Sequence, residues 1–398
     1  MSKRKILKTT PIVTLDKFPK LGVETVDNPR VQRAIDSISK GTLFLPPTTL
    51  YFDGSVTLKE NVFVMGSGIG RTIIDLGLNK SVIPFTTPKP ALKVLTQTNN
   101  LLIGDTKNII NNDLHEGDHI TYRSTNRFTE EWDNGVSIRD YYTKGEIMKI
   151  VETAPTQLTF SEACHLDFPH INSKGTEAFT PTKNIGISDL TIGRNKDSKS
   201  YGVSVLIQYC DRAYVKNIES INTNDSGIKI SKSRNVLVEN CYIAGGSKKL
   251  GLNYGVVIID GSKHVNLYNI HTTNCRHGIA GGGTGYANPM DLIADRLFID
   301  HSQSHSLDTH GNCMNFTFLN AKIDKGLSLS GIGHIAKNIL SKSGHFGPYE
   351  GGTDHSYENI TYFNCTGTFT NKIVKRIQIK NFVVNNFNFT IKTRNSFE

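Results

Sequence analysis

Short runs of alternating apolar and polar residues dominate the chain from about residue 184 onward. Each run is rich in Ile, Val, Phe and Tyr and ends at a polar residue, usually Asn. This period-two alternation predicts strands that turn one side chain inward and the next outward. The polar ends of eight successive runs are Asn217, Asn240, Asn269, Asp295, Asn320, Asn338, Asn359 and Asn381. They recur every 18 to 29 residues, which predicts one repeating coil of strands and turns.

A coil of this length is too small to bury its own apolar face, so neighbouring coils must stack. Asn at equivalent corners tolerates a left-handed backbone, and its amides can form a hydrogen-bonded ladder along the stack. No 3.6-residue period persists, which argues against a solenoid of helices. The pattern therefore predicts an all-β protein that folds as a right-handed parallel β-helix.

The first third of the chain follows a different pattern. Apolar residues at Val31, Ala34, Ile35 and Ile38 share one face of a helix, and strand-like runs follow it. A terminal helix of this kind can cap the first turn of an open-ended solenoid, so we expect a short N-terminal capping helix. We predict an N-terminal arm over residues 1–28 and a single β-helix domain over residues 29–398. Within that domain we expect an inserted β-rich segment at about 95–180 and regular turns at about 184–390.

Composition and net charge indicate which classes of molecule the protein can bind. The chain has 398 residues and a net charge of +9, which favours an anionic partner. Its basic residues are scattered without a nucleic-acid-binding motif, and no apolar run is long enough to cross a membrane, so neither partner is expected. The basic start lacks the apolar core of a secretory signal. The six cysteines form no CxxC pairs and are expected to be buried thiols rather than zinc ligands.

Several motifs resemble the pectate-lyase-like β-helix superfamily. They are the helix at 30–38, the strand pair at 41–51 and the glycine-containing coil at 56–75. Residues 117–124 and 144–151 resemble an insertion found in phage tailspikes and pre-neck appendages. The aspartate pattern that holds calcium in pectate lyases, with Arg as base, is not legible, which argues against a true pectate lyase.

The resemblance to phage tailspikes and appendages implies a virion protein that attaches to the host cell and is a homotrimer. Such proteins bind and often cleave capsular polysaccharide, exopolysaccharide or wall teichoic acid, as hydrolases or lyases. The resemblance therefore implies a receptor-binding depolymerase. Because this fold supports many functions, two alternatives remain: a non-catalytic cell-surface adhesin, and a cellular polysaccharide lyase or epimerase.

Histidines and carboxylates concentrate between residues 276 and 355, where seven of the thirteen histidines lie. Aligning the strands places His277 and His305 on adjacent turns, His345 two turns further in the same column, and Glu350 near the column of His310. Asp308 and His310 are two residues apart on one strand and point the same way. A carboxylate beside a histidine suits acid–base catalysis, and an arginine can neutralise a uronate or phosphate.

From this alignment, the candidate catalytic residues are Asp308, His310, His305 and Glu350. The candidate substrate-binding residues are Arg276, His277, His345, Tyr349 and Trp132. Trp132 lies in an aromatic loop with Tyr141 and Tyr142, which can stack on sugars or pack against the solenoid or a neighbouring subunit. We expect no metal site and no cofactor, although a divalent cation such as calcium is compatible with Asp308, His310 and a neighbouring histidine. The alternative is that the histidines are inert residues of the ladders and turns.

The glycine-rich segment at 281–286 is expected to form a loop beside the same groove.

Overall fold

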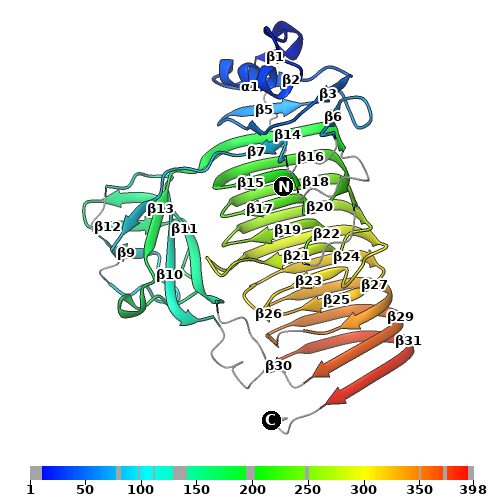
Figure 1. Cartoon of the computed structure of the whole chain (residues 1–398). Helices are drawn as coiled ribbons and strands as arrows, with labels where there is room; N and C mark the ends of the chain where they lie inside the picture. Colours follow the sequence, from blue (N-terminus) through cyan, green and yellow to red (C-terminus); the bar gives the residue numbers. More distant parts are fainter. Residues whose placement is uncertain are drawn as a thin grey trace.

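Stacked turns of a parallel β-helix make up most of the molecule (Figure 1). The computed structural model describes residues 11–77, 82–96, 99–110, 113–128, 141–193, 202–246, 251–348, 351–370 and 374–392. The strands stack from the blue N-terminal end to the red C-terminal end, and a separate group of strands projects from one side. Successive turns pair in parallel, which confirms the predicted fold class.

The N-terminal end of the solenoid is capped by the one α-helix of the described residues. The elements of this end are β1 (Ile12–Thr14), η1 (Leu15–Lys17), α1 (Asn28–Ser37), β2 (Gly41–Phe44), β3 (Thr49–Tyr51), β4 (Val56–Thr57), β5 (Val62–Met65), β6 (Ile73–Asp75) and β7 (Phe85–Thr86). The face of α1 that buries Val31, Ala34 and Ile35 packs on the core, which confirms the predicted cap. Strand β1 pairs in parallel with β2, so this part of the predicted arm forms an edge strand of the first turn.

The first long sheet of the solenoid is built from the longer strands. After the N-terminal turns these are β14 (Thr182–Gly193), β16 (Cys210–Thr223), β18 (Arg234–Gly245), β20 (Lys263–Thr273), β22 (Met290–Asp300), β24 (Thr317–Ile323), β27 (Ile335–Phe346), β29 (Ser356–Thr370) and β31 (Gln378–Lys392). In β18, Val236 and Val238 are fully buried whereas Leu237 between them is only half-buried. The alternation seen in the sequence therefore places every second side chain in the core.

A second sheet of shorter strands closes each turn and carries the candidate site. Its strands are β15 (Val203–Gln208), β17 (Ser226–Ser231), β19 (Tyr254–Ile259), β21 (His277–Gly282), β23 (Leu307–Thr309) and β25 (Gly326–Leu329). Three two-residue strands, β26 (Gly331–Ile332), β28 (Gly352–Thr353) and β30 (Val374–Lys375), pair separately near the C-terminal end. Strands β19, β21, β23 and β25 pair in sequence order, so side chains on consecutive turns lie side by side.

The long strands turn a corner at residues with positive φ. Seven of the eight predicted polar ends have φ between 49° and 58°: Asn217, Asn240, Asn269, Asn320, Asn338, Asn359 and Asn381. Their amides form a ladder in which, for example, Asn338 donates to Asn320 at 2.9 Å and Asn359 donates to Asn338 at 2.9 Å. At the remaining turn the residue with positive φ is Arg296, so the prediction of Asp295 was wrong by one position. Asp295 instead accepts a hydrogen bond from Asn320 at 2.7 Å.

A small antiparallel sheet is inserted between β7 and β14. Its elements are β8 (Lys93–Leu95), β9 (Lys107–Ile109), β10 (His119–Arg127), β11 (Thr143–Ala154), β12 (Gln157–Phe160), η3 (His170–Asn172) and β13 (Thr176–Phe179). It has an apolar core that includes Tyr122, Met148 and Phe168. Met290 and Met314 of the solenoid belong to the same cluster, so the insert packs against the solenoid.

Buried charges also join the insert to the solenoid. The ammonium group of Lys263, on β20, lies 2.7 Å from Glu146 of β11 and 2.9 Å from Glu162. Arg234 on β18 donates to the main-chain oxygen of Ile147 at 2.6 Å. Breaking a buried pair of this kind costs about 3–5 kcal/mol, because the remaining charge stays buried without a partner. The insert is therefore held in one position, which matters for the site below.

The predicted state of the cysteines is confirmed. All six are free and buried, and burial raises the pKa of Cys241 and of Cys275 to about 12. Among the described residues, no helix is long and apolar enough to cross a membrane.

Candidate functional site

The predicted cluster lies on β21 and β23, at the side of the solenoid that faces the insert. Ile279 pairs with Leu307, so His277 and His305, each two residues earlier, lie beside one another on adjacent turns. Their ring centroids are 6.1 Å apart. The predicted stacking of these two histidines is therefore observed.

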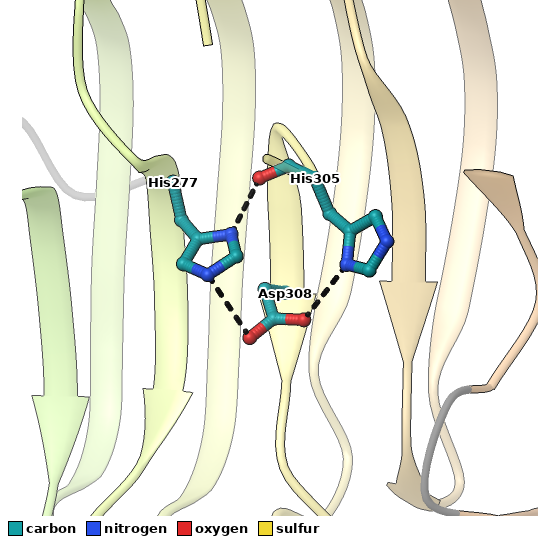
Figure 2. A group of neighbouring side chains, drawn as sticks. All are labelled: His277, His305 and Asp308. Carbon is teal, nitrogen blue, oxygen red and sulfur yellow. Dashed lines mark hydrogen bonds and ion pairs between the residues drawn. The ribbon is translucent and has the colours of Figure 1, made fainter. Parts of the chain in front are cut away.

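Asp308 lies at the centre of three imidazole rings. Its Oδ2 is 3.6 Å from Nε2 of His277 and 3.5 Å from Nε2 of His310, and its Oδ1 is 3.4 Å from Nδ1 of His305. Figure 2 shows the carboxylate directed into the space between His277 and His305. The two-residue spacing of Asp308 and His310 thus brings them together, as the sequence predicts.

Burial and charge set the protonation of this group. Nδ1 of His277 donates a hydrogen bond to the main-chain oxygen of His305 at 2.6 Å, which fixes the ring's orientation. Burial lowers the pKa of His277 to about 4, so the ring is neutral at pH 7. Burial raises the pKa of the Asp308 carboxyl, but its contacts with His277 and His305 outweigh that effect and leave the pKa well below its usual range. Asp308 is therefore ionised beside a neutral imidazole.

The insert contributes a tyrosine to the same group. The Tyr142 hydroxyl lies 2.7 Å from Nδ1 of His310, whose Nε2 faces Asp308. Tyr142 is 2% exposed, and Tyr141 packs edge-on against it with ring centroids 4.9 Å apart. The sequence placed Tyr142 in the predicted aromatic loop, but did not indicate a contact with His310. The two residues are 168 positions apart, and their contact depends on how the insert docks.

Arg276 belongs to the edge of the cluster. Its guanidinium donates to the Tyr254 hydroxyl at 3.0 Å, on the preceding turn. The Tyr254 ring in turn stacks on His277, with an interplanar angle of 14° and centroids 5.7 Å apart. Arg276 is half-buried, and its guanidinium lies 5.8 Å from the centroid of the Tyr254 ring, so it can meet an anionic group bound next to that ring.

His345 reaches the cluster in a different register from the one predicted. Gly326 pairs with His345 and, on the previous turn, Leu307 pairs with Leu327. His345 is therefore level with Ser306 rather than with His305, and the predicted common column was wrong by one residue. The slip lies between β23 and β25, because His305 is level with Lys325 and not with Gly326. Its ring nevertheless lies 5.1 Å from the His305 ring.

The remaining candidates are not placed. Glu350, Tyr349 and Trp132 lie outside the residues that the structure describes. Of the other histidines in the sequence cluster, His355 is buried in the solenoid interior and His301 is exposed at a corner, with φ of 49°. These two fit the alternative expectation of structural histidines.

The glycine-rich segment lies where the insert meets the solenoid. A Cβ on Gly282 would be 3.0 Å from the His310 ring, and a Cβ on Gly285 would be 2.0 Å from the main-chain oxygen of Tyr141. Tyr286 packs under the ammonium group of Lys232, at 3.5 Å from the ring centroid. Small residues here let the insert approach the turn that carries His310.

The arrangement can move protons. A phenol, an imidazole and a carboxylate lie in series from Tyr142 through His310 to Asp308. Such a series can hold an imidazole in one orientation and stabilise it when it accepts a proton, as in general acid–base catalysis. The adjacent rings and Arg276 offer a surface that suits sugar faces and acidic groups.

Comparisons with known proteins agree with this architecture. No family model matches the chain. The capsule K1-specific depolymerase of Klebsiella phage K64-1 is 25% identical over 221 residues, which are 52% of this chain and 23% of that relative. The chain thus spans less than a quarter of the relative's length.

Solved tailspikes share the fold. The tailspike gp49 of Pseudomonas phage LKA1 superposes with a TM-score of 0.67 at 14% identity, covering 92% of this chain and 72% of that one. The tailspike gp61 of Pseudomonas phage phi297 gives 0.71 at 15% identity, covering 94% and 65%. Gp54 of Acinetobacter baumannii bacteriophage AP22, solved in complex with a capsular saccharide, gives 0.69 at 13% identity, covering 94% and 69%. The chain has the parallel β-helix of phage tailspikes, and the resemblance stated from the sequence is confirmed at the level of the fold.

Proposed function

We propose that the chain binds a bacterial surface polysaccharide and cleaves it where the insert meets the solenoid. The proposal is supported by a relative described as a capsule depolymerase and by a structural neighbour solved with a capsular saccharide. The net charge of +9 suits an acidic polymer. Each of these observations is general, and the choice of site depends on the geometry.

The observation that carries the proposal is the contact series Tyr142–His310–Asp308. The three side chains come from the insert, from the end of β23 and from β23 itself, and they meet at 2.7 Å and 3.5 Å. In this proposal His310 transfers the proton, Asp308 stabilises the charged ring and Tyr142 holds its orientation. Arg276 neutralises an acidic group of the bound polymer.

Two bond-breaking reactions are compatible with this series. In hydrolysis, the protonated ring of His310 donates its proton to the glycosidic oxygen, water attacks the sugar, and Asp308 accepts the proton that the water loses. In β-elimination, the neutral ring of His310 removes the proton next to a uronate carboxyl and returns it to the oxygen of the leaving sugar. Elimination leaves a double bond in the product that absorbs ultraviolet light, so the absorbance of the product separates a lyase from a hydrolase.

The wider setting follows the same proposal. The chain would act as part of a virion tail or appendage, as a homotrimer, in host-cell attachment. Capsular polysaccharide and exopolysaccharide are the first candidate substrates, and wall teichoic acid is the second. A single chain already brings Tyr142 and Asp308 together, so the proposed catalytic series lies within one subunit.

The test is depolymerisation of purified polymers, measured as the fall in polymer size by size-exclusion chromatography. The panel contains capsular polysaccharides, beginning with capsule K1, and wall teichoic acid. We expect the protein to shorten at least one acidic polymer. Asp308→Asn and His310→Ala should each lower the rate about 10²–10⁴-fold, because general acid–base catalysis contributes a factor of this size.

Matched controls separate chemistry from folding. Asp16 is exposed in η1 at the N-terminal end, and the side chain of His115 is 82% exposed, next to Asp118. Asp16→Asn and His115→Ala should retain the full rate. Full activity of both Asp308→Asn and His310→Ala would refute the assignment. Tight binding to a polymer without any shortening would instead support the adhesin alternative.

A further inference from the structure

Nε2 of His277 faces the carboxylate of Asp308 but is too far from it to form a hydrogen bond. Nε2 of His277 is buried, has no hydrogen-bond partner among the described residues, and lies 3.6 Å from Oδ2 of Asp308. This separation exceeds a hydrogen bond. Nδ1 of His277 donates its proton to the His305 carbonyl, so Nε2 is the ring nitrogen that faces Asp308 and can act as a ligand atom. A cation bound between Nε2 and the carboxylate would give both buried atoms a partner.

A second nitrogen faces the same carboxylate. Nδ1 of His305 lies 3.4 Å from Oδ1 of Asp308, and the potential ligand atoms of His277, His305 and Asp308 all lie within 4.8 Å of one another. Figure 2 shows both rings turned toward the carboxylate from neighbouring turns. Atoms bound at about 2.1 Å to one ion lie roughly 3.0–3.5 Å apart in tetrahedral or octahedral geometry. The separation of 3.4 Å lies within this range, and that of 3.6 Å lies just above it.

We propose that Nε2 of His277, Nδ1 of His305 and the carboxylate of Asp308 bind one divalent transition-metal ion, with zinc as the reference ion. Two imidazoles and one carboxylate on a single face leave the opposite positions open to water or substrate. The two nitrogen donors favour zinc over calcium, which takes oxygen ligands. The ligand set thus differs from the calcium compatibility inferred from the sequence, and it uses His277 rather than His310.

The surroundings of the three ligands resemble those of metal-binding histidines. Such histidines almost always donate their second ring N–H to a carbonyl or carboxylate, which fixes the tautomer. His277 does so through the His305 carbonyl, and it is additionally held by the stacked ring of Tyr254. His277 therefore cannot turn its Nε2 away from Asp308 without breaking both contacts.

Metal binding does not depend on the proposed cleavage. The ion would, however, lie beside His310, which contacts the same carboxylate oxygen as His277. In a depolymerase, and resting on that proposed function, the ion would hold the carboxylate or a hydroxyl of an acidic sugar next to His310.

The test titrates the metal alone into tag-free protein that has been stripped with a chelator, in the absence of any polymer. Isothermal titration with zinc should show one ion bound per chain, with calcium binding much more weakly. His305→Ala and Asp308→Asn should each weaken zinc binding about 100-fold or more. His115→Ala, which removes an exposed histidine outside the site, should leave it unchanged.

Folding is checked on the same samples by thermal unfolding without metal. His305 is half-buried and Asp308→Asn keeps the side chain's shape, so both variants should remain folded. The visible spectrum of bound cobalt, which reports coordination number and nitrogen ligation, gives a second readout. Absence of saturable binding to the unaltered protein, or binding that both variants retain, would overturn the proposal. Loss of polymer cleavage alone would not overturn it, because metal binding is measured in the absence of polymer.

Discussion

Buried histidines have two different kinds of partner in this molecule. Around Asp308 they face a carboxylate, whereas His334 and His355 stack on one another in the interior, with ring centroids 4.8 Å apart. His334 donates through Nε2 to the Ser330 carbonyl at 2.8 Å and accepts the Phe316 N–H through Nδ1 at 3.0 Å. The sequence predicted the density of histidines but could not separate these roles. The distinction depends on which side of the chain each ring faces.

The stacked pair predicts a loss of stability in acid. Burial lowers the pKa of His334 to about 4, and burial together with the neighbouring His334 lowers that of His355 to about 2. In the unfolded chain both pKa values are near 6.5. Between these values the unfolded chain binds more protons, so the free energy of unfolding falls as the pH drops from about 6.5 toward 4. For His334 alone the loss is on the order of 3 kcal/mol.

Unfolding by guanidinium chloride at several pH values between 7 and 4 measures this effect. His334→Gln keeps a donor and an acceptor but does not titrate, so its stability should depend less on pH than that of the unaltered protein. The same pH dependence in both proteins would show that this histidine pair does not control acid stability.

At the scale of elements, regular turns were easier to predict than their exact register. The capping helix and the Asn corners follow from local periodicity and from the tolerance of Asn for positive φ. Loops of variable length between turns are not constrained by that periodicity. The predicted corner residue was therefore Asp295 instead of Arg296, and the predicted column placed His345 level with His305 instead of Ser306.

The way in which the insert packs against the solenoid could not be predicted from local patterns in the sequence. The contact of Tyr142 with His310 depends on buried pairs such as Lys263 with Glu146, which join segments 117 residues apart. No period or motif in the sequence encodes such a pairing. The part of the candidate site on the solenoid could thus be predicted, and the part from the insert could not.

Gly285 lies so close to the main chain of Tyr141 that a larger residue there should disturb the contact between the insert and the solenoid. In Gly285→Ala the new Cβ would lie 2.0 Å from the Tyr141 carbonyl oxygen, and the residue has φ of +79°. The left-handed backbone alone costs alanine about 1–2 kcal/mol. The contact adds to this cost and pushes the insert away from the turn that carries His310. We expect a lower melting temperature and at least a tenfold lower rate of depolymerisation.

Gly22→Ala is the matched control for Gly285→Ala. Gly22 also has positive φ, at +53°, but a Cβ there would meet nothing within 4 Å. It should show the backbone cost with unchanged activity. Equal activity of the two variants would mean that the junction does not position the site.

At the scale of the whole molecule, the stacked turns of the solenoid form a long side along which a polymer can lie. The insert contacts this side where Tyr142 meets His310. A parallel β-helix supports many functions, so the fold alone does not select one. We base the proposed function on the group in which three histidines surround Asp308 and Tyr142 of the insert contacts one of them. The oligomeric state and the virion location remain predictions from the resemblance to tailspikes.

The most direct test is a crystal structure of Asp308→Asn bound to an oligosaccharide of the polymer that the unaltered protein shortens. We predict a sugar in contact with His310, with its acidic group toward Arg276 and the scissile linkage next to residue 308. An oligosaccharide bound only on another face of the solenoid, away from β21 and β23, would contradict it.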